Sequence, residues 1–161
     1  MSNIVFKHND PDCYYDNKLM LHDCIADKIA YRNGVLQFEF SDGFWITTNH
    51  EANSLEKVVR TDSSQVDFRI DNINDVNIHV YTESLFGKIK VEFWNINKLI
   101  EYVNNKKYSI EFIYQYRSHF EQMWHCYIRS KKRTCFKDCY IHLPGANAVY
   151  KWNDLCKNRE W

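Results

Sequence analysis

Glycine and proline are scarce in this sequence, since 161 residues contain four glycines and two prolines. The glycines lie far apart, so they cannot build the glycine-rich loops that bind dinucleotides or phosphates. The sequence also lacks a His-Glu-x-x-His zinc motif, a calcium-binding loop and a Gly-x-Ser-x-Gly nucleophile motif. These absences argue against nucleotide-dependent chemistry, and we expect neither an enzyme nor a bound cofactor.

A surplus of charge is also absent, because 21 basic side chains balance 21 acidic ones. Proteins that bind nucleic acids, or that bind membranes through basic patches, carry a positive surplus. Residues 1–13 show no basic segment followed by an apolar run, and no later segment approaches the roughly 18 apolar residues of a membrane helix. We therefore expect a soluble cytoplasmic protein that binds neither nucleic acid nor membranes.

Six cysteines are present, and without a secretion signal they are expected to be reduced thiols. Several lie close in sequence to histidines, in the set His125, Cys126, Cys135, Cys139 and His142. A hairpin that pairs Ile128 with Cys135 would turn these cysteines to one face of a sheet and the histidines to the other. We therefore expect buried thiols and no metal site.

Apolar and polar residues alternate along most of the chain, which is typical of antiparallel sheets with one face on a core. In the clearest case, the range 25–40, Asn33-Gly34 can adopt the two positive φ angles of a type I′ turn. The expected cross-strand pairs are Arg32–Val35, Tyr31–Leu36, Ile29–Phe38 and Asp27–Phe40. Asp27 is then a polar exception, expected either at the sheet margin or with a hydrogen-bond partner.

Further alternation predicts strands in the ranges 66–70, 76–80, 89–93, 108–112, 124–128 and 135–141. The period becomes helical near 95–105, where Asn95 can cap an amphipathic helix. The tail carries Val149, Trp152, Leu155 and Cys156 at a spacing compatible with a short C-terminal helix. The predicted fold class is α+β, mostly antiparallel β with about seven to nine strands, in a single β-rich domain over residues 1–161.

Two sets of residues are catalytic candidates by residue type. His22 and Cys24 share a face of an extended segment, but side chains two apart on a strand usually splay too far for a nucleophilic dyad. Glu39, Asp42 and Glu51 are acidic residues near aromatics, yet nothing in the sequence pairs two of them across a cleft as glycoside hydrolysis requires. No catalytic residue is therefore assigned.

Aromatic residues are the most distinctive feature, at 16% of the chain. Several have no place in the core alternation, and exposed Tyr and Trp side chains beside Arg are common anchors of protein interfaces. We expect a partner-binding patch formed by Trp45, Tyr114, Tyr116, Tyr127, Arg117 and Arg129.

The stretch 21–46, with His22-Asp23-Cys24 at its start and Asp42-Gly43-Phe44-Trp45 near its end, resembles the opening hairpin of small uncharacterised bacterial proteins. Such β-rich proteins are similar in character to immunity proteins of bacterial toxin systems. The resemblance implies a non-enzymatic cytoplasmic protein that binds a protein partner such as a cognate toxin.

One alternative stays open: a small-ligand-binding protein, or an unusual enzyme, with a β-walled cavity near His22 and Cys24 or His125. An enclosed cavity that converges on polar groups would favour this alternative, whereas an exposed aromatic patch would favour protein binding.

Overall fold

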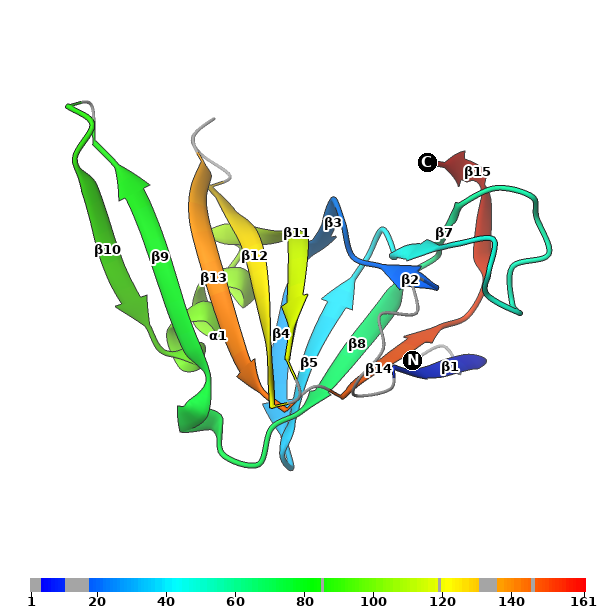
Figure 1. The fold of residues 1–161 in the computed structure, drawn as a ribbon, viewed down its shortest axis with the longest axis horizontal. Coiled ribbons are helices and arrows are strands. Elements are labelled where there is room, and N and C mark those ends of the chain that lie inside the picture. Colours follow the sequence, from blue (N-terminus) through cyan, green and yellow to red (C-terminus); the bar gives the residue numbers. More distant parts are fainter. Residues whose placement is uncertain (1–3, 11–17, 85, 119, 131–135, 146) are drawn as a thin grey trace.

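The computed structural model describes residues 4–10, 18–84, 86–118, 120–130, 136–145 and 147–161. In this part of the chain it contains fifteen β-strands, one α-helix and one short 3-10 helix (Figure 1). The strands form three sheets, and their paired neighbours are antiparallel. The mostly antiparallel α+β class is confirmed. The expected number of about seven to nine strands is wrong, because strands of two or three residues are too short to show alternation, and because the strands Phe6–Asp10, Ala148–Trp152 and Leu155–Glu160 were not predicted.

The first sheet has five strands, in the spatial order β1-β14-β8-β5-β4. Their bounds are Phe6–Asp10 for β1, Ala148–Trp152 for β14, Ser64–Arg69 for β8, Val35–Phe40 for β5 and Lys28–Arg32 for β4. The predicted hairpin is confirmed, with Ile29 opposite Phe38 and φ angles of 51° at Asn33 and 75° at Gly34. Asp27 lies just beyond this ladder and is exposed, so it takes the predicted place at the margin.

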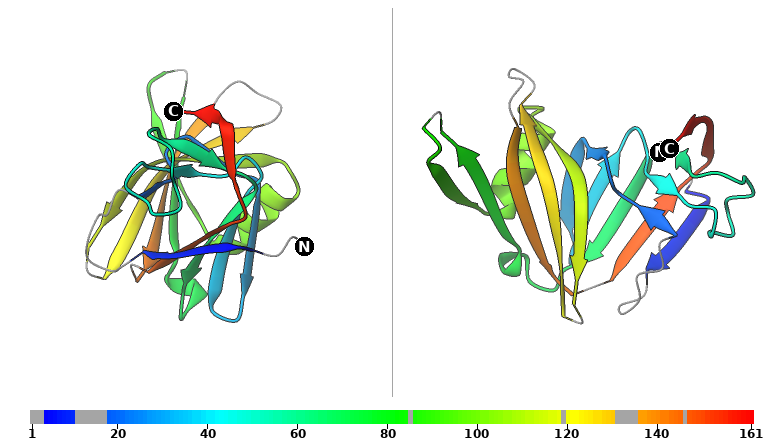
Figure 2. Two further views of the ribbon diagram at one scale, coloured as in Figure 1. Left: turned by 90° about the vertical axis from the view of Figure 1, so that its right-hand side faces the viewer. Right: turned by 45° about the horizontal axis from the view of Figure 1, so that its top comes forward.

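The second sheet has six strands, in the order β10-β9-β13-β12-β11-β3 (Figures 1 and 2). Their bounds are Ile89–Trp94 for β10, Asn77–Glu83 for β9, Phe136–Pro144 for β13, Glu121–Ser130 for β12, Tyr108–Arg117 for β11 and Cys24–Ala26 for β3. The predicted pairing of Ile128 with Cys135 is wrong, because Ile128 lies opposite Lys137, and Cys135 itself lies outside the described residues.

The register of β12 against β13 differs from the prediction by two residues, an even number that leaves the side chains on their predicted faces. Cys126 lies opposite Cys139, and both are fully buried. His125 and His142 are half-buried on the opposite face. The separation of cysteines from histidines is therefore confirmed for the described residues.

The core lies between the inner faces of the two large sheets and the helix α1 (Ile96–Asn104). The predicted helix near 95–105 is confirmed, since the Asn95 side chain accepts a hydrogen bond from the Lys98 N–H, and Leu99 and Val103 are buried. At the end of α1, the Asn104 amide exchanges two hydrogen bonds with the main chain of Ile29. No helix in the described part of the chain is long and apolar enough to span a membrane.

The third sheet has four short strands, in the order β15-β7-β6-β2. Their bounds are Leu155–Glu160 for β15, Val59–Thr61 for β7, Trp45–Ile46 for β6 and Leu19–Met20 for β2. The predicted C-terminal helix is therefore wrong, because Ala148–Trp152 and Leu155–Glu160 form the strands β14 and β15. Burial in β14 alternates, with Ala148, Tyr150 and Trp152 inside, so the helical spacing of the tail was coincidental.

In the strand β10, the side of the strand that faces the core is opposite to the predicted one. Ile89, Val91 and Phe93 were expected to face the core, but their exposed fractions are 69%, 41% and 76%. Trp94 is buried instead, with its ring packed against Tyr102 of α1 at a centroid distance of 5.2 Å. The large indole thus determines which side of β10 faces inward, and the smaller apolar side chains face outward.

Two glycines with similar backbones provide a stability test. Gly43 and Gly87 have φ angles of 74° and 70°, but a Cβ at Gly43 would overlap the main-chain oxygens of Thr61 and Asp62, whereas the space around Gly87 is open. Gly87→Ala should cost about 1 kcal/mol, the strain of positive φ alone, and Gly43→Ala about 2 kcal/mol more. Urea denaturation measures both, and equal losses would contradict the close approach at Gly43.

Candidate functional site

A row of aromatic side chains crosses the outer face of the six-stranded sheet, away from the core. Its members, here called the aromatic row, are Tyr114, His125, Tyr140, His79 and Phe93, from β11, β12, β13, β9 and β10. Each lies directly opposite the next in the strand register. Ring centroids are 4.8 Å apart for His125 and Tyr140 and 4.9 Å apart for His79 and Phe93. Figure 1 shows these five strands side by side, with α1 behind them.

A β-bulge in β11 places Tyr114 on this face. Ile110 and Phe112 are buried, and uninterrupted alternation would carry Tyr114 to the same inner side. The register shifts between Phe112 and Tyr114, so Tyr114 and Tyr116 face outward with exposed fractions of 54% and 52%. The His22 Nδ1–H donates a hydrogen bond of 2.6 Å to the Ile113 carbonyl within the bulge. His22 therefore supports the local backbone that orients Tyr114.

Two open hollows lie beside the aromatic row. One, of about 450 Å³, is lined by Tyr81, Glu83, Ile89, Asp138 and Tyr140. The other, of about 390 Å³, is lined by Asp75, Asn77, His79, Phe120, Glu121, His142 and Pro144. Both hollows are open to solvent and contain apolar and charged groups. They suit side chains projecting from another molecule better than an enclosed small ligand.

One carboxylate lies at the centre of this face. The Asp138 Oδ1 lies 2.8 Å from His125 Nε2, so this contact holds the imidazole of β12 against the neighbouring strand β13. Partial burial, together with the negative charge of Asp138, raises the pKa of the Tyr140 phenol above its usual value. Tyr140 therefore keeps its proton at neutral pH and can donate a hydrogen bond.

The structure brings together part of the predicted patch. Tyr114, Tyr116, Tyr127 and Arg129 belong to the outer face, and Arg129 forms an ion pair with Glu111. Arg117 does not belong to the outer face. It lies opposite the buried Gln122, and after the bulge it shares the other side of β11 with Gln115.

The prediction also placed Trp45 wrongly, in the exposed patch. It is only 8% exposed, and it lies in β6 with its Nε1–H donating to the His22 carbonyl. Its ring packs against Trp161 and beneath the Arg60 guanidinium. The expectation that Trp45 anchors an exposed patch with Tyr114 is therefore wrong.

Sequence reasoning missed His79, Tyr81 and Phe93 as surface residues, and it left Tyr140, which lies outside the core alternation, out of the predicted patch. The outward positions of His79, Tyr81 and Tyr140 follow from the polar side of the alternation in β9 and β13, whereas Phe93 faces outward because β10 turns its predicted inner side to solvent. Histidine and tyrosine at alternate positions of the strands β9 and β13 are the sequence pattern that could have predicted an aromatic outer face.

His22 and Cys24 do not form a dyad. The Cys24 thiol donates to the carbonyls of Met20 and His22, and His22 Nδ1 is hydrogen-bonded to Ile113. Burial raises the pKa of the Cys24 thiol to about 12, so the thiolate needed for nucleophilic attack is not formed at neutral pH. Neither of the two hollows described above is lined by His22 or Cys24.

The candidate carboxylates Glu39, Asp42 and Glu51 do not meet in one cleft. Each forms an ion pair with a different basic residue. Glu39 pairs with Lys28, Asp42 with Arg159, and Glu51 with Lys18. The arrangement matches a solvated charged surface and contains no acid–base couple of the kind that glycoside hydrolysis requires.

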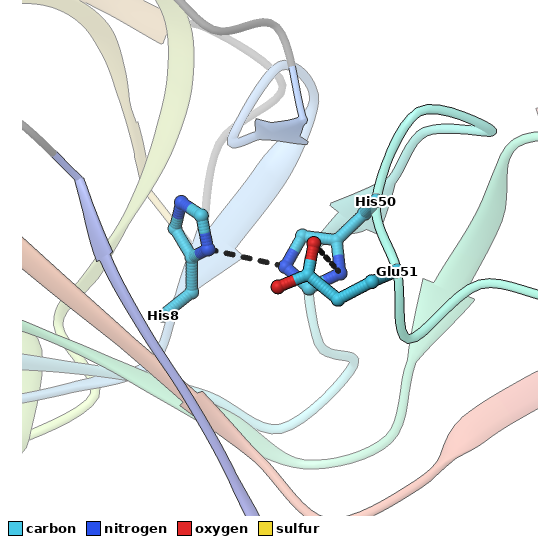
Figure 3. Close-up of side chains that lie close together, drawn as sticks. All are labelled: His8, His50 and Glu51. Carbon is cyan, nitrogen blue, oxygen red and sulfur yellow. Dashed lines mark hydrogen bonds and ion pairs between the residues drawn. The ribbon is translucent and has the colours of Figure 1, made fainter.

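A group that could hold a metal ion consists of His8, His50 and Glu51 (Figure 3). His50 Nε2 lies 3.2 Å from His8 Nδ1, and the Glu51 carboxylate lies 3.9 Å from His50 Nδ1. His50 is buried, whereas Glu51 is exposed. No sequence pattern predicts this group, because His8 and His50 meet only when β1 joins the five-stranded sheet.

Hydrogen bonding at His50 favours a histidine pair over a metal site. The Ala52 N–H donates to His50 Nδ1 at 3.0 Å, so Nδ1 carries a lone pair and Nε2 of the neutral ring carries the proton. That Nε2–H then donates to His8 Nδ1. A metal ion on His50 Nε2 would require Nδ1 to take the proton and lose the bond from Ala52.

We therefore expect His50 to be the Nε2–H tautomer, with no metal bound between His8 and His50. A long-range proton–nitrogen NMR spectrum measures the tautomer, and thermal unfolding with one equivalent of Zn²⁺ tests the site. The midpoint should not rise with zinc in wild type or in His50→Ala. A rise confined to wild type would show instead that the cluster binds metal.

Thiol reactivity tests the core assignment of the cysteines. In a chain with Cys13, Cys135 and Cys156 changed to Ser, the remaining thiols are Cys24, Cys126 and Cys139, and burial raises the pKa of all three. At pH 8 about one Cys24 in 10⁴ carries a thiolate, so a disulfide reagent should react with these three thiols only upon unfolding. Rapid reaction of Cys24 in the native protein would support a nucleophile instead.

Comparisons with known proteins leave the chain without an assigned family. No family model matches it, and no curated protein or solved structure shows a significant match. The similarity to immunity proteins therefore stays an expectation, and the functional argument depends on the surface of the protein itself.

Proposed function

We propose that this chain is a non-enzymatic cytoplasmic protein that binds a folded protein partner, such as the toxin bound by an immunity protein. The aromatic row is the observation that carries the proposal. Aromatic side chains with a polar atom are enriched in the energetically important centres of protein interfaces. Here five aromatic rings lie in register across five strands, and four of them, Tyr114, His125, Tyr140 and His79, carry a polar atom.

The rigidity of the sheet supports this function. Rings fixed by cross-strand neighbours lose little freedom when a partner binds, so less of the interaction energy is spent on ordering them. His125 is an example, because it stacks on Tyr140 and is hydrogen-bonded to Asp138. Zero net charge is compatible with binding, since electrostatic complementarity at an interface is local.

The probe for this proposal is the purified protein encoded by the gene next to this one. Calorimetric titration should show binding, and Tyr114→Ala should weaken it by about 2 kcal/mol, or roughly thirtyfold in Kd. Tyr116→Ala, which removes a second exposed ring beside the row, should weaken it as well. If the probe is toxic to cells, co-expression of this chain should restore growth, and Tyr114→Ala should reduce that protection.

Phe86→Ala is the matched control, because Phe86 is 90% exposed but lies outside the aromatic row. Circular dichroism and the unfolding midpoint should be unchanged in all three variants. Equal binding by wild type, Tyr114→Ala and Tyr116→Ala would contradict the proposed surface, and absence of binding to the probe would contradict the proposed partner.

A further inference from the structure

The strand β10 forms an open edge of the six-stranded sheet. Its described neighbour is β9, with which it pairs over all six residues without a bulge. Natural proteins usually protect such an edge with charged side chains, proline, a bulge or a covering segment, because its free main-chain groups can pair with another strand; the charges on β10 are of both signs, Lys90 and Glu92, so they do not by themselves repel a second copy. β10 contains no proline, and the β9–β10 hairpin lies at one end of the molecule, far from β15 (Figure 1).

The main-chain groups of Ile89, Val91 and Phe93 face this open side. The Ser84 N–H donates to the Lys88 carbonyl at the start of the hairpin, which identifies these two residues as a hydrogen-bonded pair. Hydrogen-bonded and non-hydrogen-bonded pairs alternate along an antiparallel ladder, so the even-numbered residues of β10 bond to β9. The odd-numbered residues therefore have N–H and C=O groups directed outward.

The side chains of β10 complement a second copy of the same strand. With Val91 opposite Val91 of the second copy, two antiparallel β10 strands place Lys90 opposite the partner's Glu92, and Glu92 opposite the partner's Lys90. On the outer face, Ile89 then lies opposite the partner's Phe93. Cross-strand pairs of opposite charge and of apolar residues each stabilise a sheet.

Neighbouring registers are less complementary. Moving the two-fold axis by one residue places Lys90 opposite the partner's Lys90, or Glu92 opposite the partner's Glu92. Like charges directly opposite each other are unfavourable. Within one chain, Lys90 Nζ already lies 3.4 Å from Glu92 Oε1, so the Val91-centred pairing would join four alternating charges.

We propose that two copies of this protein pair through their β10 edges, antiparallel and centred on Val91, to form one continuous sheet. The two-fold axis is perpendicular to this sheet, so the aromatic rows of both copies lie on the same face. This assembly goes beyond the proposed function and does not require it. Six residues per strand bury less than the roughly 1,200–2,000 Å² of stable interfaces, so we expect a Kd on the order of 10 µM or weaker.

Charge exchange tests both the pairing and its register. Sedimentation velocity of the full chain from about 5 to 500 µM should show a reversible dimer. Lys90→Glu and Glu92→Lys should each weaken self-association about tenfold or more, because each places like charges opposite each other. An equimolar mixture of the two variants should form a heterodimer, since every Glu of one chain then meets a Lys of the other.

Lys7→Glu is the matched control, because it makes the same charge change on β1, the exposed edge strand of the five-stranded sheet, and should leave the dimer unchanged. Glu92→Lys also removes the hydrogen bond from Trp94 Nε1, so folding of each variant is checked by its unfolding midpoint. The Lys90→Glu/Glu92→Lys double variant, which restores opposite charges within one sequence, should recover the dimer.

A wild-type protein that stays monomeric at the highest concentration would overturn the proposal, as would a dimer insensitive to all the charge changes. A wild-type monomer that binds the neighbouring gene product more weakly after Lys90→Glu would assign the edge to a strand of that partner. Tyr114→Ala should not affect the dimer, so failure of this proposal is distinguishable from failure of the aromatic surface.

Discussion

The packing of Phe112 between the two large sheets is the contact on which the rest of the structure depends. Its ring lies 5.4 Å from Phe38 and 5.5 Å from Phe40 of the five-stranded sheet, and 5.1 Å from Trp124 of the six-stranded sheet. Joining the sheets in this way defines the inner face of β11 and, through the strand register, of β12, β13 and β9. Side chains alternate along each strand, so the same contact also decides which residues form the outer surface.

The bulge that follows Phe112 separates core from surface within one strand. Cys24 lies opposite Phe112 and is buried, whereas His22, two residues earlier, bonds to the bulged carbonyl of Ile113. The apparent dyad of His22 and Cys24 is thus divided between two structural roles. The thiol fills the core as a small apolar group, and the imidazole satisfies a main-chain carbonyl that the bulge removes from the regular ladder.

The outer face of the six-stranded sheet combines stacked aromatic rings with hydrogen-bonded polar groups. Its carboxylate Asp138 is bonded to His125, and the hollows beside the aromatic row are open to solvent. Such a face suits recognition of another protein, because its rings are ordered before binding. The proposed pairing of β10 edges is a second means of association, through main-chain groups and the side chains that flank them. The aromatic row lies on the face of the sheet, whereas β10 lies at its edge. A second copy paired to the edge therefore leaves the aromatic row accessible.

Local patterns in the sequence determined the elements whose residues interact at short range. Asn33-Gly34 specified its hairpin and register because the turn geometry and the alternating apolar residues agree, and Asn95 with the apolar spacing after it specified α1. Alternation also placed Cys126 and Cys139 in the core. It could not show the bulge at Ile113, the burial of Trp45, the outward side of β10 or the meeting of His8 with His50. Those depend on which distant strands become neighbours, and hence on packing between residues that are far apart in the sequence.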